Sequence, residues 1–205
     1  LIIYKMVVII FNDNNNIPQY YNSFKEILKL DNYNDIIYID YSCDKLSSLP
    51  KLPNSLQRLH CEYNNLSILP ELPNSLTELY CHYNNLSSLP ELPNSLIQLY
   101  CDHNMLSSLP ELPHSLTHTS CNCNNLSSLP QIPNSLTHFN YYCSPIFYYI
   151  KDYFNGKHQQ YFEHQKKIQK IFINKIGDWY LDCKYNPKYL YCRNRLMKEY
   201  EELYT

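Results

Sequence analysis

Cysteines and histidines recur in this chain in a pattern that first suggests metal binding or thiol chemistry. Four cysteines share one fixed interval along the chain, and a mixed group lies close to the last of them: Cys61, Cys81, Cys101 and Cys121, then Cys123, His103, His118 and His138. Zinc prefers these residue types, but three or four must converge at about 2.0–2.3 Å from the ion. Here the spacing comes from a repeat and not from a short ligand motif, so we predict neither a metal nor another cofactor.

Catalytic chemistry is also disfavoured by the sequence. Acidic residues and histidines occur together in the repeated region, but no nucleophile has a paired base and an orienting acid. The chain contains only two glycines, so a glycine-rich loop that cradles phosphate is not expected. A candidate reactive thiol, Cys183, falls on an apolar helical stripe, where a buried thiol is inert. We therefore predict that the protein is not an enzyme.

The element that must position these side chains is a repeated unit, which reads LPNSLTELYCHYNNLSSLPE over residues 72–91. Successive units begin at a leucine, and a degenerate unit comes before them: Leu56, Leu76, Leu96, Leu116 and Leu136, with Ile36 first. Self-similarity at a fixed period of about 20 residues predicts a solenoid. Each unit can bury its leucines only against its neighbours, so the units are expected to stack their strands in parallel.

Each unit starts with a short strand whose side chains alternate between two faces. In one unit, the predicted inward residues are Leu76, Leu79 and Cys81, and the predicted outward residues are Glu78, Tyr80 and His82. Free cysteine behaves as a small buried hydrophobe. We therefore expect the four regularly spaced cysteines to pack in the core.

Asparagines and prolines complete the unit. An asparagine occupies the position where each strand turns away: Asn64, Asn84, Asn104 and Asn124. Its amide can donate to and accept from turn backbone that would otherwise stay unpaired. Two prolines in each return segment exclude a helix and favour extended, polyproline-like backbone on the convex side.

The segments that flank the repeats are expected to cap the apolar ends of the solenoid. In front, residues 2–11 are predicted to form a strand and residues 17–30 a helix, with Phe24, Ile27, Leu28 and Leu30 inward. This helix would be a crossover that adds one more parallel strand to the sheet. Behind the repeats, helices are predicted over residues 144–155, 157–184 and 186–205. The predicted boundaries are 1–35 for the N-terminal cap, 36–149 for the repeats and 150–205 for the C-terminal cap.

Charge and composition narrow the class of partner. Residues 31–144 carry three Lys or Arg against ten Asp or Glu, whereas residues 145–205 carry eleven against seven. An acidic solenoid is a poor partner for nucleic acid, whose binding depends on neutralised phosphates. The apolar run at residues 1–11 is shorter than the roughly 20 residues of a membrane span. With nine cysteines and no signal peptide expected, we predict a cytoplasmic protein with free thiols.

Five proline-containing returns stand in register: Leu49–Pro53, Leu69–Pro73, Leu89–Pro93, Leu109–Pro113 and Leu129–Pro133. With the leucine pattern of residues 36–149, they resemble the shortest kind of leucine-rich repeat, found in bacterial secreted effectors. The resemblance implies an α/β leucine-rich-repeat solenoid with a curved parallel sheet of six to seven short strands, an extended convex side and helical caps at both ends. The asparagine-rich, alanine-free composition and the tail also resemble leucine-rich-repeat proteins of giant viruses.

The resemblance to bacterial effectors implies two alternatives for function. Several of those effectors carry a C-terminal ubiquitin-ligase domain with a catalytic cysteine, and the segment that follows the repeats here, from residue 150 onward, is expected to be too short for that domain. The chain would then be the substrate-recognition part of such an effector, with its catalytic domain lost or supplied by another chain. A purely structural role is the other alternative.

The prediction we favour is that the concave sheet face binds a protein, with the chain a monomer and, if it is viral, with a host target. Outward residues differ between units while inward ones hardly vary, although drift on an unconstrained surface would give the same pattern. Tyrosines provide large, rigid contact area and are enriched in interfaces. The predicted partner-binding residues are Arg58, His60, Tyr63, Glu78, Tyr80, His82, Tyr83, Gln98, Tyr100, Asp102, His103 and His118.

Overall fold

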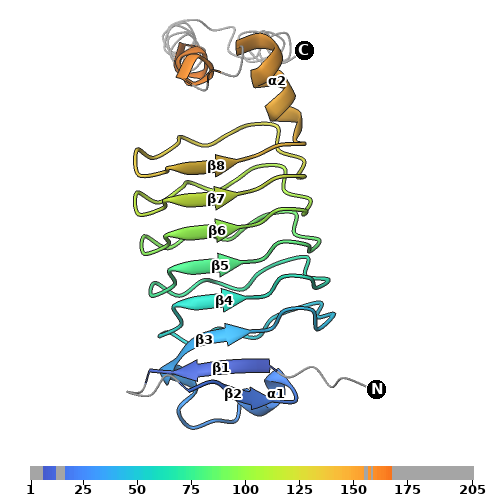
Figure 1. The fold of residues 1–205 in the computed structure, drawn as a ribbon, viewed down its shortest axis with the longest axis vertical. Coiled ribbons are helices and arrows are strands. Elements are labelled where there is room, and N and C mark those ends of the chain that lie inside the picture. The colour runs from blue at the N-terminus through green and yellow to red at the C-terminus, as the bar shows by residue number, and fades with distance from the viewer. Residues whose placement is uncertain (1–6, 13–16, 155–156, 158, 168–205) are drawn as a thin grey trace, which may run out of the picture. The chain divides into compact units, whose positions relative to one another are not determined.

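The computed structural model describes residues 7–12, 17–154, 157 and 159–167. Its central feature is an eight-stranded sheet with the strand order β2-β1-β3-β4-β5-β6-β7-β8 (Figure 1). The strands are β1 (Val7–Phe11), β2 (Gln19–Tyr21), β3 (Ile36–Asp40), β4 (Arg58–His60), β5 (Glu78–Tyr80), β6 (Gln98–Tyr100), β7 (His118–Ser120) and β8 (His138–Asn140).

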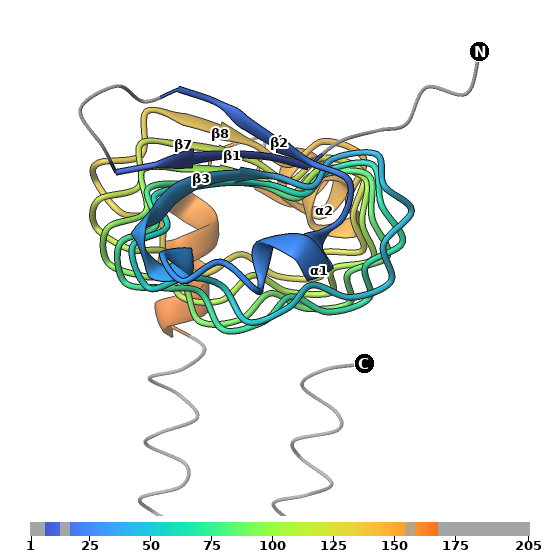
Figure 2. The ribbon, with the colours of Figure 1, turned by 90° about the horizontal axis from the view of Figure 1, so that it is seen from below.

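Strands β3 to β8 are parallel, and each is offset from the next by one repeat unit. Arg58 pairs with Glu78, and Leu79 pairs with Leu99. Each unit therefore makes one coil, with a short strand on one side and a return segment on the other (Figure 2). The predicted solenoid of short repeats is confirmed, and the sheet has more strands than predicted because two antiparallel strands precede the repeats.

The leucines of successive coils form the core. Leu59, Leu79 and Leu99 are fully buried on the strands, and Leu66 and Leu86 are fully buried where the chain enters the return. Complete burial of one leucine side chain stabilises the fold by about 1.5–3 kcal/mol relative to its exposure. The predicted alternation is also confirmed, since Glu78, Tyr80 and His82 lie on the opposite face and are partly exposed to solvent there.

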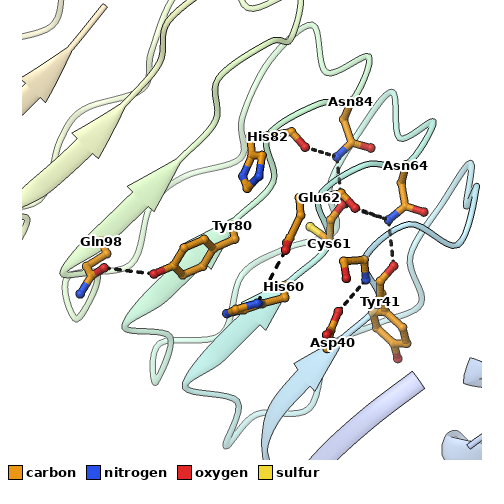
Figure 3. Close-up of polar contacts among 11 residues, drawn as sticks. Asp40, Tyr41, His60, Cys61, Glu62, Asn64, Tyr80, His82, Asn84 and Gln98 are labelled. Atoms are coloured by element: carbon orange, nitrogen blue, oxygen red, sulfur yellow. Dashed lines mark hydrogen bonds and ion pairs between the residues drawn. The ribbon is translucent and has the colours of Figure 1, made fainter. Parts of the chain in front are cut away.

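The asparagine at the end of each strand ties neighbouring coils together, as predicted. The Asn84 amide nitrogen donates to the carbonyl oxygens of Cys61 (2.9 Å) and Cys81 (3.1 Å), and its Oδ1 accepts from the Leu66 amide at 3.0 Å. Asn64 makes the equivalent bonds one coil earlier (Figure 3). Each buried amide thus satisfies backbone groups that the turn leaves without a ladder partner.

The proline-rich returns of the described coils contain neither helix nor strand, and their extended, polyproline-like conformation stays a prediction. In each coil a tight turn follows the second proline, where the Leu76 amide donates to the Pro73 carbonyl at 3.0 Å. The Ser75 hydroxyl donates to the Leu56 carbonyl of the preceding coil at 2.7 Å. Side-chain bonds of this kind link the returns, where no strand ladder runs.

The N-terminal end differs from its prediction. Strand β1 is antiparallel to β3, with Ile9 opposite Ile39, and β2 is antiparallel to β1, with Val7 opposite Tyr21. The predicted additional parallel strand is therefore wrong. The antiparallel β1 covers the edge of β3 and buries Ile9 completely, and β2 forms the edge of the sheet, so β3 is covered without a crossover helix.

The predicted helix over residues 17–30 is also wrong. Its first part forms β2, and its remainder forms only the four-residue helix α1 (Phe24–Ile27), which a 3-10 turn at Tyr33–Asp35 follows. Pairing with β1 outweighs the helical periodicity, because tertiary contacts override a weak local propensity. Of the predicted inward residues, Ile27 is fully buried whereas Leu28 is exposed, and the Phe24 ring lies edge-on to Tyr41 at 6.5 Å.

A helix follows the last coil, as predicted. Helix α2 spans Pro145–Phe154, and its Ile146 and Ile150 are buried. The Ile146 amide donates to the Leu126 carbonyl at 2.9 Å, which joins the start of α2 to the repeats. The predicted C-terminal boundary and the caps at both ends stay predictions.

Residues 153–205 form a second compact unit, in which residues 159–167 are helical. The predicted helix over residues 157–184 continues beyond the described residues, and the one predicted over residues 186–205 lies outside them. Over the part of the chain that the structure describes, none of the helices has the length and apolar character to cross a membrane.

Candidate functional site

All twelve predicted partner-binding residues are displayed on or beside the exposed face of the sheet. Their places are β4 for Arg58 and His60, β5 for Glu78 and Tyr80, β6 for Gln98 and Tyr100, β7 for His118, and the turns after the strands for Tyr63, His82, Tyr83, Asp102 and His103. Because the coils are in register, equivalent residues form columns across the sheet. Their role in binding stays a prediction, but their geometry is defined.

One column carries a row of neighbouring aromatic rings, which we call the strand row: His60, Tyr80 and Tyr100. The His60 and Tyr80 ring centroids are 4.4 Å apart with their planes tilted by 36°, and those of Tyr80 and Tyr100 are 4.8 Å apart and stacked, with 19° between the planes. The Tyr80 hydroxyl donates to Gln98 Oε1 at 3.2 Å (Figure 3). Stacking at the coil spacing holds these rings upright on the sheet, so little side-chain entropy is left to lose on binding.

A second row runs parallel to the first along the turns, and we call it the turn row: Tyr63, Tyr83 and His103. Tyr63 and Tyr83 stack at 4.6 Å with 9° between the planes, and Tyr83 and His103 stack at 4.2 Å with 10°. Offset stacking of this kind contributes about 0.5–1.5 kcal/mol for each pair beyond the area it buries.

The turn row depends on unusual backbone. Tyr63, Tyr83 and His103 have φ values of 55°, 53° and 50°, in the left-handed region that costs a non-glycine residue about 1–2 kcal/mol. Amide hydrogen bonds to the next coil hold this conformation, from Tyr63 to His82 at 3.0 Å and from Tyr83 to Asp102 at 2.9 Å. This left-handed conformation was not predicted from the sequence. The signal in the sequence was the scarcity of glycine. With only two glycines in a chain that must turn after every strand, other residues have to adopt the turn conformation.

A shallow hollow of about 360 Å³ lies between the two rows. It is lined by Tyr63, Tyr80, His82, Tyr83, Tyr100, Asp102, His103, Ser120 and Asn122. The structure thus brings seven of the twelve predicted residues together around one site. The other five lie outside its lining: Arg58, His60, Glu78, Gln98 and His118.

Two residues that line the hollow were missed by the prediction, Ser120 and Asn122. They continue the columns of Tyr100 and Asp102 by one coil, so the repeat register was the signal that could have found them. Asp102 Oδ1 accepts hydrogen bonds from the Ser120 hydroxyl (2.5 Å) and the Asn122 amide (2.9 Å). Both donors are neutral, so the Asp102 charge is held in place but not neutralised.

The electrostatic character of this face is negative. Burial raises the pKa of the Tyr80 hydroxyl, the carboxylates of Glu78 and Glu62 raise it further, and only Arg58 lowers it. The tyrosine is therefore neutral at physiological pH, and its surroundings disfavour added negative charge. The face is suited to a cationic or neutral partner group.

Two buried polar atoms beside the hollow have no hydrogen-bond partner among the described residues, Glu62 Oε2 and His82 Nδ1. The other Glu62 oxygen lies 3.8 Å from His60 Nδ1 (Figure 3). An unsatisfied buried polar group costs about 1–3 kcal/mol. A partner or a bridging water that reached either atom would recover part of that cost.

The thiols behave as the packing prediction requires. Cys61, Cys81, Cys101 and Cys121 are buried and free, and burial raises the pKa of the Cys81 thiol well above its ordinary value. In the turns, burial and the neighbouring Cys143 thiol raise the pKa of the Cys123 thiol, and Cys143 is exposed. Over the described ranges, no three His, Cys, Asp or Glu side chains are grouped as a metal ion would need.

Comparison with solved structures shows that this solenoid is similar to a repeat domain of a bacterial effector. A leucine-rich-repeat domain of a Shigella effector is 39% identical and covers 58% of this chain and 53% of its own, with a TM-score of 0.54. YopM from Yersinia enterocolitica is 35% identical over 49% of this chain and 27% of its own, with a TM-score of 0.40. YopM from Yersinia pestis is 32% identical over 53% and 37%, with a TM-score of 0.44.

The fold and the comparison together define the class: the chain contains a solenoid of short leucine-rich repeats, similar to the repeat domains of bacterial effectors. The match spans about half the length of the Shigella domain. Among protein-family models and curated proteins, none matches this sequence.

Proposed function

We propose that this chain acts without catalysis, by binding another protein on the exposed face of its sheet. The observation that carries the proposal is the hollow between the strand row and the turn row, where four tyrosines and two histidines gather. Tyrosine supplies contact area at low entropic cost and is enriched among the residues that dominate binding energy. Similarity to an effector repeat domain supports a scaffold for protein interaction.

The proposal includes a cytoplasmic location and a monomeric protein. It also includes a host protein as the partner, a step that rests on the resemblance of the composition to giant-virus proteins. The acidic repeats favour a partner whose contact surface is neutral or basic, since complementary potentials raise association rates and suppress wrong partners.

A second candidate is the substrate-recognition part of a ligase-type effector, for which the similarity to the Shigella domain is the support. The same face would then hold the substrate of a catalytic domain on another chain. A ubiquitin-discharge assay on everything that wild type captures from lysate separates the two, because a ligase-type assembly co-captures the catalytic chain and discharges charged ubiquitin-conjugating enzyme, whereas a simple binding module leaves that enzyme unchanged.

The test of the first proposal is affinity capture from host-cell lysate with wild type and the Tyr80→Ala/Tyr100→Ala variant. We expect the variant to lose capture of any partner that wild type enriches, with its melting temperature within a few degrees of wild type. The matched control is Tyr148→Ala/Tyr149→Ala, which removes two exposed tyrosines from α2 instead. Equal capture by wild type and the Tyr80/Tyr100 variant would overturn the proposal.

A further inference from the structure

The strand row ends abruptly inside the hollow. The rings of His60, Tyr80 and Tyr100 follow one another one coil apart, tilted in the first pair and stacked in the second, but the next residue of the same column is Ser120, which pairs with Tyr100 in the strand register. Among the described residues no ring stacks on the far side of Tyr100, whereas Tyr80 is covered on both sides. One face of the Tyr100 ring therefore has no ring partner and lies above Ser120, a small buried side chain whose hydroxyl accepts from the Asn122 side-chain amide at 2.9 Å.

A carboxylate stands next to this open face. Asp102 lies two residues after Tyr100 and lines the same hollow. Its Oδ1 is used by Ser120 and Asn122, while within the described chain no residue donates to Oδ2 and no Lys or Arg pairs with it. An ionised carboxylate can accept about four hydrogen bonds, so Asp102 retains capacity for a charged donor.

The same sheet already shows how a cation is held on a tyrosine. The Arg58 guanidinium carbon lies 5.2 Å from the centroid of the Tyr38 ring, and the two residues are neighbours in the register of β3 and β4. A guanidinium is planar and stacks on an aromatic face at a distance close to the ring-to-ring spacing of the row. The coil spacing that places the Arg58 guanidinium on the Tyr38 ring leaves room for a second guanidinium on the Tyr100 ring.

The surrounding charge favours a cation at this place. Residues 31–144 carry ten Asp or Glu against three Lys or Arg. After burial, the Asp102 carboxylate is the next cause that raises the pKa of the Cys81 and Cys121 thiols, so its field reaches across the coils on both sides. A negative field with open ring surface is the combination that attracts a guanidinium.

We propose that the hollow is an arginine-binding site, in which a guanidinium from an extended, basic segment of the partner stacks on the open face of Tyr100 above Ser120 and donates to Asp102. This inference rests on the proposed function and names the partner chemistry of the same face. Arginine suits the site better than lysine, because it combines a planar stacking surface with a fork of N–H donors that matches a carboxylate.

The probe is a short fluorescein-labelled peptide of alternating serine and arginine, with lysine and citrulline versions for comparison. Fluorescence polarisation should show the arginine peptide binding wild type, with binding weaker by at least about fivefold for the lysine peptide and for the neutral citrulline peptide. Asp102→Asn retains the acceptor for Ser120 and Asn122 and should weaken binding by about tenfold. The charge-matched control Glu91→Gln, on the return side, should leave binding within about twofold.

A second variant fills the open place. Ser120→Tyr places a tyrosine at the repeat position that Tyr80 and Tyr100 occupy in the preceding coils, so the substitution is compatible with the coil. It should weaken binding of the arginine peptide as strongly as Asp102→Asn does. Equal binding of the arginine and lysine peptides, or undiminished binding to Ser120→Tyr, would overturn the arginine site.

Lysate capture separates this failure from failure of the proposed function. If Asp102→Asn and Ser120→Tyr still capture the partner while Tyr80→Ala/Tyr100→Ala does not, the face binds a protein by other chemistry and the arginine site is wrong. If all of these variants capture as wild type does, the proposed function itself is wrong.

Discussion

The two faces of the same strands follow opposite rules. On the inner face, Leu79 and Leu99 repeat, Cys81 and Cys101 repeat, and all four are fully buried. On the outer face, the columns change from coil to coil, as where Tyr100 gives way to Ser120. The repeated buried residues, which we call the inner ladder, therefore fix the distance between neighbouring coils. On the outer face this distance allows rings of successive coils to stack, and it leaves a space where a small residue replaces a ring.

Among the residues of the inner ladder, we expect substitution of an asparagine to reduce the stability of the fold most. Asn84→Ala removes an amide that bonds four backbone groups across two coils. We expect the free energy of unfolding to fall by about 2–4 kcal/mol, because buried backbone groups are left unpaired. Urea denaturation measures the loss. Asn85→Ala changes the exposed neighbour and should stay within about 0.5 kcal/mol of wild type; similar losses for both variants would contradict the ladder.

Thiol labelling compares the two faces within one molecule. In the native protein, an alkylating reagent should modify Cys143 at least about tenfold faster than Cys81, because the thiolate is the reactive form and burial disfavours it. Raising the pH from 7 to 9 should not bring Cys81 into reaction, since its pKa lies well above the ordinary value and the thiol stays protonated. Peptide mapping by mass spectrometry reads each site. Equal labelling in folded protein would show that the cysteine column is open.

The backbone of the turn row provides a smaller contrast with the strand row. Tyr83→Gly should be more stable than Tyr83→Ala by about 1 kcal/mol, because glycine removes the cost of the left-handed conformation at φ 53°. Tyr80 lies on β5, where the order should reverse by about 0.5–1 kcal/mol in favour of alanine. Thermal or chemical unfolding of the four variants tests this. The same order at both sites would refute strain in the turn row.

Much of the inner ladder was predictable from the sequence, because it depends on residue type at a fixed period. The leucine, cysteine and asparagine positions recur at the same places in four successive units, so their burial and the parallel register follow from one unit. The N-terminal end has no such repetition. There Tyr21 pairs with Val7 in an antiparallel strand, a tertiary choice that the helical periodicity of residues 17–30 did not reveal.

For the candidate site, the sequence predicted most of the residues that form it but not their geometry. The alternation placed Tyr80, Tyr100 and Asp102 on the outer face, but it could not give the stacking distances or the left-handed turns. The sequence columns contain the step from Tyr100 to Ser120. Its meaning as an open ring face depends on the 4.8 Å stack, which only the structure provides.

Binding on the exposed sheet face can be observed by hydroxyl-radical footprinting of the protein alone and with its captured partner. Tyr63 in the turn row and Tyr148 on α2 are both 51% exposed, so they start from comparable accessibility and chemistry. We predict that the partner protects Tyr63 and its row neighbour Tyr83 and leaves Tyr148 unchanged. Protection of Tyr148 with no change at Tyr63 and Tyr83 would contradict binding on the exposed sheet face.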